Sequence, residues 1–370
     1  MKTHVYTCAI FSPIRNVLGD VFENKLEVER WCVLPNEIYI GNRDADVAPE
    51  SDRRSSSRKE VKAIEIDGRS DLTSIAFLHD GKHVVSGGKE GRIRLWQVED
   101  GAEVGTPMDA GTNICSLAAS RDGKWVVSGT GVCRVTVWNA ENRSKAKEFR
   151  GHGSYVYAVD ILPDATRIAT GSDDGTVCVW SLPDGQRLLG PLQLAKHVVA
   201  VKVSPDGCLI AIAMWSPDSV QIHDSQTGRL IFGVPVQVGS TFNQSLAWAN
   251  DNKRLFVLSS NGDINCFDPS TGSTLPKWHV SSSSSGMGIA LASNGKFIAA
   301  SSGPSVSFWD TTSRKRIGSV IRHTADIVGM AISTNYDIVV AGGKKITLRD
   351  LSDVVPSSYY EDVSTLISDA

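Results

Sequence analysis

Hydrophobic and polar positions alternate in short runs, separated by turn residues, over most of the chain. The clearest example is the segment of residues 151–181, GHGSYVYAVDILPDATRIATGSDDGTVCVWS. Its apolar runs, at 155–162, 167–171 and 176–180, are rich in Val, Ile and Tyr. Pro-Asp and Asp-Asp-Gly sequences separate these runs, which is typical of β-strands joined by tight turns.

The residue that ends the third strand of this pattern recurs at nearly constant spacing. It is found at Trp96, Trp138, Trp180, His223, Phe267, Trp309 and Arg349, with successive differences of 42, 42, 43, 44, 42 and 40. A period of about 40 to 45 residues is typical of four-stranded propeller blades. The spacing therefore predicts an all-β fold with seven repeats.

Four side chains of the central segment can form a hydrogen-bonded relay across one blade. We expect Asp174 to accept a hydrogen bond from His152, and His152 to donate to the hydroxyl of Thr170. The same hydroxyl would reach the indole N–H of Trp180. The relay would join the strands of this blade.

The segment resembles the WD40 repeat. It opens with Gly151-His152, as that repeat does, and its Trp180-Ser181 pair stands where the family usually has Trp-Asp. The resemblance covers residues 61–351 and implies a seven-bladed WD40 β-propeller. It also implies a rigid platform for protein partners, without chemistry of its own.

The resemblance further implies how the ring closes. In this family the repeat is offset from the blade, so the last blade takes its outer strand from the start of the domain. Residues 61–66, VKAIEI, alternate suitably and would pair beside residues 345–350. That pairing would remove open sheet edges.

The relay is uneven along the chain. Its hydroxyl is Ser86, Ser128 and Thr170 in the first three repeats, but the equivalent residues are Ala213, Val257 and Ala341 in the fourth, fifth and seventh. The histidine position is Gly68 in the first repeat and returns as His323 in the last. A buried network is favourable only when each member is satisfied, so we expect repeats without the histidine to lose the hydroxyl as well.

The face where each first strand begins is the predicted partner surface. The residues at this position are Asp71, Asn113, Tyr155, His197, Phe242, Ser285 and Asp326, and Trp215 is their neighbour. They would surround the central channel, and aromatic residues beside polar ones are typical of interaction hot spots. Residues 281–285, all serine, would form a slack loop or a phosphorylation target on this face.

Enzymatic chemistry is not expected. His152 and Asp174 could be a catalytic pair, but Trp180 occupies the neighbouring hydroxyl and no nucleophile elbow or phosphate loop is present. The cysteines, seven in number, show neither a Cys-x-x-Cys pair nor histidines at ligand spacing, which favours small buried residues over a disulfide framework or zinc site. We therefore expect no cofactor and no metal.

The flanks differ from the repeats. Residues 1–40 form an extension with an amphipathic helix at about 13–27, whose apolar stripe would dock on the following domain or once faced a missing one. Residues 41–60 are a polar linker in which Arg53, Arg54, Arg58 and Lys59 could bind nucleic acid. Residues 352–370 form an acidic tail, which we expect to be frayed from Ser357 onward.

The composition restricts the expected partners and location of the protein but indicates no activity. The formal net charge of -3 provides no field for nucleic acid or an anionic membrane. No signal-peptide core or membrane span is visible, so the expected location is intracellular, in the cytoplasm or the nucleus. We expect a monomeric propeller within a larger complex, since a closed ring covers its own edges.

The turn sequences support a narrower resemblance. Residues 172–176, SDDGT, and Asp206-Gly207 resemble propellers of filamentous and mushroom-forming fungi. Residues 4–7 and the helix at Pro13 resemble the lead-in to the propeller of NACHT-WD40 sensor proteins. The hypotheses are therefore a scaffold for protein or peptide partners, the propeller half of such a sensor, or a subunit associated with nucleic acid or chromatin.

Overall fold

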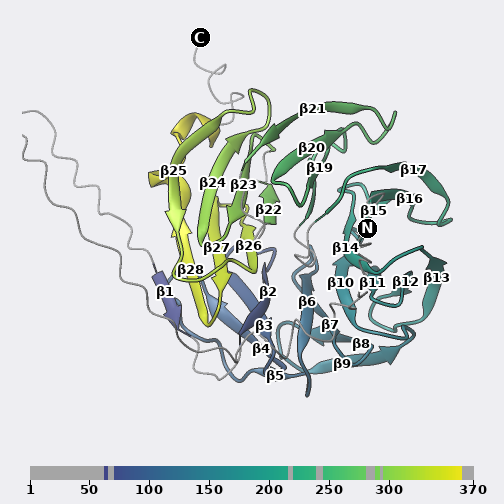
Figure 1. The fold of residues 1–370 in the computed structure, drawn as a ribbon. Coiled ribbons are helices and arrows are strands. Elements are labelled where there is room, and N and C mark those ends of the chain that lie inside the picture. The colour runs from purple at the N-terminus through teal and green to yellow at the C-terminus, as the bar shows by residue number, and fades with distance from the viewer. Residues whose placement is uncertain are drawn as a thin grey trace, which may run out of the picture. The chain divides into compact units, whose positions relative to one another are not determined.

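The computed structural model describes residues 62–65, 71–215, 220–238, 245–280, 288–291 and 295–360. In these residues it contains seven antiparallel sheets of four strands each, which form the blades of a propeller (Figure 1). The all-β, seven-bladed prediction is confirmed. The expected helix at 13–27 and the linker at 41–60 lie outside the described residues.

The blades follow one another along the chain, and the first strands of neighbouring blades contact each other. In order along each sheet, blade 1 contains β2 (Leu72–Phe77), β3 (His83–Gly88), β4 (Arg92–Gln97) and β5 (Met108–Asp109); blade 2 contains β6 (Ile114–Ala119), β7 (Trp125–Thr130), β8 (Arg134–Asn139) and β9 (Lys145–Arg150); and blade 3 contains β10 (Val156–Ile161), β11 (Arg167–Ser172), β12 (Thr176–Ser181) and β13 (Arg187–Gln193). Blade 4 contains β14 (Val198–Val203), β15 (Leu209–Met214), β16 (Val220–Asp224) and β17 (Leu230–Val234), and blade 5 contains β18 (Leu246–Trp248), β19 (Leu255–Leu258), β20 (Asp263–Phe267) and β21 (Thr274–His279). Blade 6 contains β22 (Gly288–Leu291), β23 (Phe297–Ser302), β24 (Ser305–Asp310) and β25 (Arg316–Arg322), and blade 7 contains β26 (Gly329–Ile332), β27 (Asp337–Gly342), β28 (Lys345–Asp350) and β1 (Lys62–Glu65).

The ring closes between the two ends of the repeat region. Strand β1 pairs antiparallel with β28, with Lys62 opposite Leu348 and Glu65 opposite Lys345. Ile64 packs against the apolar cluster that blades 7 and 1 share. The predicted closure is confirmed, and blade 7 gains its outer strand from the start of the domain.

The hydrophobic core lies between adjacent blades. Glycines in the second strands allow the first strand of the next blade to approach closely. A Cβ at Gly129 would lie 2.8 Å from Val156 Cγ1, and one at Gly171 would lie 2.7 Å from Val201 Cγ2. Blades therefore pack face to face, which fixes the ends of the first strands on one side of the ring.

Strand register corrects two predicted equivalences. Thr170 pairs with Cys178, two residues before Trp180. By the same register the equivalents are Ile212 in blade 4, which pairs with Gln221, and Val340 in blade 7, which pairs with Thr347. The predicted equivalents Ala213 and Ala341 were therefore wrong by one residue. The connection between the second and third strands differs in length in these two blades, where the repeat spacing departs from 42. The Val257 equivalence is correct.

The segment after β28 is structured as far as residue 360. It forms two 3-10 helices, η1 (Leu351–Asp353) and η2 (Ser357–Tyr359), and Leu351, Val354 and Val355 are buried against blades 6 and 7. Tyr360 also donates a hydrogen bond of 2.6 Å from its hydroxyl to the carbonyl of Leu351. The prediction that the chain frays from Ser357 onward was therefore wrong for residues 357–360, because apolar burial there outweighs the loss of conformational entropy.

Candidate partner-binding face

A repeated backbone hydrogen bond places the predicted partner residues at equivalent positions. The carbonyl oxygens of residues 71, 113, 155 and 197 accept from the amides of residues 89, 131, 173 and 215, at 3.0, 3.2, 2.9 and 2.9 Å. Each accepting residue immediately precedes the first strand of its blade. Asp71, Asn113, Tyr155 and His197 therefore lie on one face in blades 1 to 4, and Trp215 is bonded to His197.

The remaining predicted residues are less informative. Asp326 precedes the first strand of blade 7 and is exposed. Asp71 is engaged in a surface ion pair with Lys89, at 3.0 Å. Phe242 and Ser285 lie outside the described residues, as do residues 281–284. The candidate surface thus rests on blades 2 to 4.

Gly131 brings Asn113 and Tyr155 together. A Cβ at this position would lie 2.7 Å from both Asn113 Nδ2 and Tyr155 Cε1. A side chain at this position would force Asn113 or Tyr155 to shift, so the glycine allows their close approach. The amide of blade 2 and the ring of blade 3 therefore share one site.

Tyr155 stacks on Tyr157, a residue that the sequence did not identify. The ring centroids are 5.6 Å apart and the planes differ by 7°. Tyr157 lies at a shift in the β10–β11 register, between Val156 and Ala158. Burial, and secondarily the negative charge of Asp173, raise the pKa of its phenol. The same shift in register recurs at residues 73, 115 and 199. These residues and Tyr157 are spaced 42 apart, so the repeat period could have identified Tyr157 from the sequence.

Asp173 is the carboxylate of this region and was also missed. Its side chain is only 14% exposed. Oδ2 accepts a hydrogen bond of 3.0 Å from Ser154, whereas Oδ1 is buried and has no hydrogen-bond partner. His197 Nδ1 lies 3.1 Å from Oδ1 but is closer, at 2.5 Å, to the main-chain oxygen of Asp173. The carboxylate is therefore incompletely compensated.

These contacts join three blades into a continuous surface, which we call the Tyr155 arc. Its members are Asn113, Tyr155, Tyr157, Asp173, His197 and Trp215. The arc combines the half-buried rings of Tyr155 and Trp215 and the buried ring of Tyr157 with an amide, an imidazole that is 45% exposed and a mostly buried carboxylate. This mixture is suited to recognition of another molecule.

The relay residues lie in the interior of blade 3. Trp180 Nε1 donates to Thr170 Oγ1 at 2.7 Å, and His152 Nε2 is 2.7 Å from the same oxygen. On its other side, His152 Nδ1 is 2.8 Å from Thr176 Oγ1, which donates to Asp174 at 2.6 Å. Thr176 was missed because it reads as an ordinary strand residue.

Hydrogen-bond counting fixes the direction of this relay. The single hydroxyl proton of Thr176 goes to the Asp174 carboxylate, so Nδ1 of His152 must donate to Thr176. Burial lowers the pKa of His152, against the opposing charge of Asp174, and keeps the ring neutral. Nε2 then accepts from Thr170, so the expected donation from imidazole to Thr170 was wrong.

Other blades keep only part of the relay. Trp96 donates to Ser86 at 2.8 Å and Trp138 donates to Ser128 at 3.0 Å, although neither blade supplies a histidine. The expectation that the hydroxyl is lost together with the histidine was therefore wrong, because the indole alone satisfies it. In blade 7, by contrast, Nε2 of His323 is buried without a partner.

Three of the described cysteines are held in the thiol form by burial. Burial raises the pKa of Cys115 to about 12 and those of Cys178 and Cys266 to about 11, so these thiols stay protonated at neutral pH. The Thr170 hydroxyl is engaged in the relay. Within the described residues, no group of three or more His, Cys, Asp or Glu side chains could hold a metal ion.

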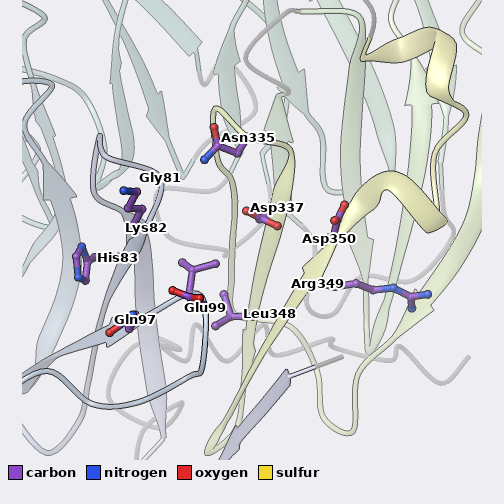
Figure 2. A pocket seen from close by; sticks show the side chains of 11 residues that line it. Gly81, Lys82, His83, Gln97, Glu99, Asn335, Asp337, Leu348, Arg349 and Asp350 are labelled. Atoms are coloured by element: carbon purple, nitrogen blue, oxygen red, sulfur yellow. The ribbon is translucent and has the colours of Figure 1, made fainter. Parts of the chain in front are cut away.

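A cavity of about 580 Å³ lies at the seam between blades 1 and 7. It is lined by the turns between first and second strands and by the ends of the third strands, at the opposite end of the strands from the Tyr155 arc. Figure 2 shows Lys82 and His83 from blade 1 and Asp337 and Asp350 from blade 7, while the Arg349 guanidinium points away. Because the lining carries charges of both signs, it defines no ligand class.

Comparison with known proteins identifies the repeat in two places. The family model described as WD domain, G-beta repeat matches residues 61–97 and 143–181. Each match begins in the region of an outer strand, β1 or β9, and ends with the third strand of the next blade. This supports the predicted offset between repeat and blade. A comparison with curated proteins found no match.

Proposed function

We propose that this seven-bladed propeller is a non-enzymatic, intracellular scaffold that binds a protein or peptide partner on the face carrying the Tyr155 arc. Proteins with WD40 repeats are typically platforms for protein interaction, and two segments of this chain match that repeat. In the described residues, no helix has the length and apolar character needed to cross a membrane. The described cysteines are free thiols, as is usual in a reducing compartment.

The observation that carries the proposal is the position of Tyr155. Its ring is half-buried, backed by Tyr157 and flanked by Asn113, so it is both held in place and accessible. Aromatic anchors fixed before binding lose little conformational entropy when a partner docks.

Affinity purification followed by mass spectrometry tests the proposal. Tyr155→Ala, alone and with Phe242→Ala, should remove a partner that the unchanged protein retains. Leu188→Ala is the matched control, because Leu188 is 55% exposed on the outer strand β13, away from the arc. An unchanged set of partners for the Tyr155 variants, with thermal stability retained, would exclude this face.

The alternative roles rest on residues outside the described part of the chain. A sensor propeller of the NACHT-WD40 kind is suggested by the sequence of residues 4–7 and by the helix expected at Pro13, and genomic sequence upstream would then encode a phosphate loop. A nucleic-acid role would depend on Arg53 to Lys59 and predicts an affinity that falls steeply with salt. The geometry of the described residues favours the scaffold.

A further inference from the structure

We propose that the Tyr155 arc recognises a cationic side chain, lysine or arginine, of an extended peptide segment in its partner. This inference rests on the proposed function and adds the chemistry of the ligand. It follows from three features of the arc: the aromatic stack, the incompletely compensated carboxylate and the absence of lysine and arginine among its members.

The aromatic stack provides a surface for a cation. Faces of aromatic rings are negative, and a cation within about 6 Å of a ring centroid is attracted to them. Tyr155 and Tyr157 lie nearly parallel, so one outer face of the pair can receive a ligand while the inner faces contact each other. Tyr155 is the more exposed of the two and would be that receiving ring.

The carboxylate supplies the charge. The main-chain amide of Asp173 bonds to the carbonyl of Tyr155, which ties the two residues together. Asp173 Oδ1 is buried without a hydrogen-bond partner, although His197 Nδ1 lies 3.1 Å away. Beside burial, the negative charge of Asp173 raises the pKa of the Tyr157 phenol. A buried carboxylate without full compensation is unfavourable until a positive charge approaches. A ligand cation would provide that charge.

The surroundings disfavour other ligand classes. A phosphate or an acidic peptide would meet the charge of Asp173 without an arginine or lysine in the arc to offset it. The nearest lysine in sequence, Lys196, is exposed beside His197 and would repel a cation weakly. This neighbour offers an independent test, because reversing its charge should strengthen binding of a cation.

Fluorescence anisotropy with the full chain tests the inference. The probes are pools of labelled nine-residue peptides whose central residue is fixed as arginine, lysine, citrulline or glutamate. We expect the arginine or lysine pool to bind at least tenfold more tightly than citrulline and glutamate pools. Asp173→Asn should reduce this preference by about fivefold or more, whereas Lys196→Glu should increase it about twofold to fivefold.

The controls separate failure of this inference from failure of the proposed function. Leu188→Ala should leave the preference unchanged, and thermal melting checks that Asp173→Asn remains folded. Equal binding of the arginine and citrulline pools, or stronger binding of the glutamate pool, would overturn the inference. If a partner is still lost on Tyr155→Ala in that case, the scaffold role stands without cation recognition.

Discussion

Trp180 donates a hydrogen bond from Nε1 to Thr170 Oγ1 at 2.7 Å, inside blade 3. Both residues are buried, and the same oxygen is 2.7 Å from His152 Nε2. The Thr170 hydroxyl therefore satisfies two buried groups, the indole N–H of Trp180 and the imidazole Nε2 of His152. Its loss leaves both without a partner, so blade 3 depends on this threonine more than blades 1 and 2 depend on their serines.

Replacing Thr170 should measure this dependence. Thr170→Val keeps the shape and removes the hydroxyl, and we expect it to lower the free energy of unfolding by about 1 to 3 kcal/mol. Thr170→Ala should cost at least as much, whereas Ser128→Ala strands only Trp138 and should cost less. Urea denaturation measures each change. An effect of Thr170→Val equal to or smaller than that of Ser128→Ala would contradict the relay.

The stability of the propeller should depend on pH through His152. Burial lowers the pKa of this imidazole below its ordinary value of 6.5. As the pH falls through 6.5, the unfolded chain takes up a proton before the folded chain does, so the free energy of unfolding decreases. The contribution is fully present above the unfolded pKa and declines until folded His152 also titrates.

Unfolding free energies at pH 7.5, 6.5 and 5.5 check this expectation. His152→Gln removes the titrating group, so the variant should be less stable at pH 7.5 but should lose less stability towards pH 5.5. The remaining histidines and the carboxylates are common to both proteins. If the wild-type and variant stabilities fall in parallel, His152 is not the group responsible.

The turn between the first and second strands offers a stabilising change. Ala165 has a φ of 53°, in the left-handed region, where blades 2 and 4 hold Gly123 and Gly207 and blades 5 and 7 hold Asn252 and Tyr336. The backbone of a non-glycine residue is strained in this region. Replacing the residue by glycine removes the strain, and this gain in stability exceeds the conformational entropy that the glycine loses on folding. Ala165→Gly should therefore raise the free energy of unfolding by about 0.5 to 1 kcal/mol.

A matched alanine provides the control. Ala102 is exposed in another turn and is not among the described residues with positive φ. Ala102→Gly should leave stability unchanged or lower it by up to about 1 kcal/mol. Thermal melting of both variants checks the pair, and destabilisation by Ala165→Gly would show that the turn does not carry the expected strain.

Residues and strands that follow the repeat period could be predicted from the sequence, whereas those at irregular positions could not. The 42-residue spacing located Trp96, Trp138 and Trp180, because strand alternation and period determine them directly. The pairing of β1 with β28 was implied by the resemblance to the WD40 repeat, in which the repeat is offset from the blade. The spacing failed at Ala213 and Ala341, where loop lengths change and only strand register identifies the equivalent residue.

The candidate site was predicted only in part, for the same physical reason. Tyr155 and His197 follow from counting back along the repeat, whereas Tyr157 occupies an irregularity that simple alternation assigns to the core. Asp173 reads as a turn residue. Its importance depends on contacts with Ser154 and His197, which come together only when neighbouring blades pack.

Site-specific photo-crosslinking at position 155 tests the central claim most directly. A benzoylphenylalanine in place of Tyr155 keeps an aromatic ring at this position, extends it by a benzoyl group and reacts with neighbouring C–H groups on irradiation. The same substitution at Leu188 is the control. We predict that irradiation in cells attaches a discrete partner at position 155 and not at position 188. No adduct at 155, or the same adducts at both positions, would contradict the assignment of this face as the recognition surface.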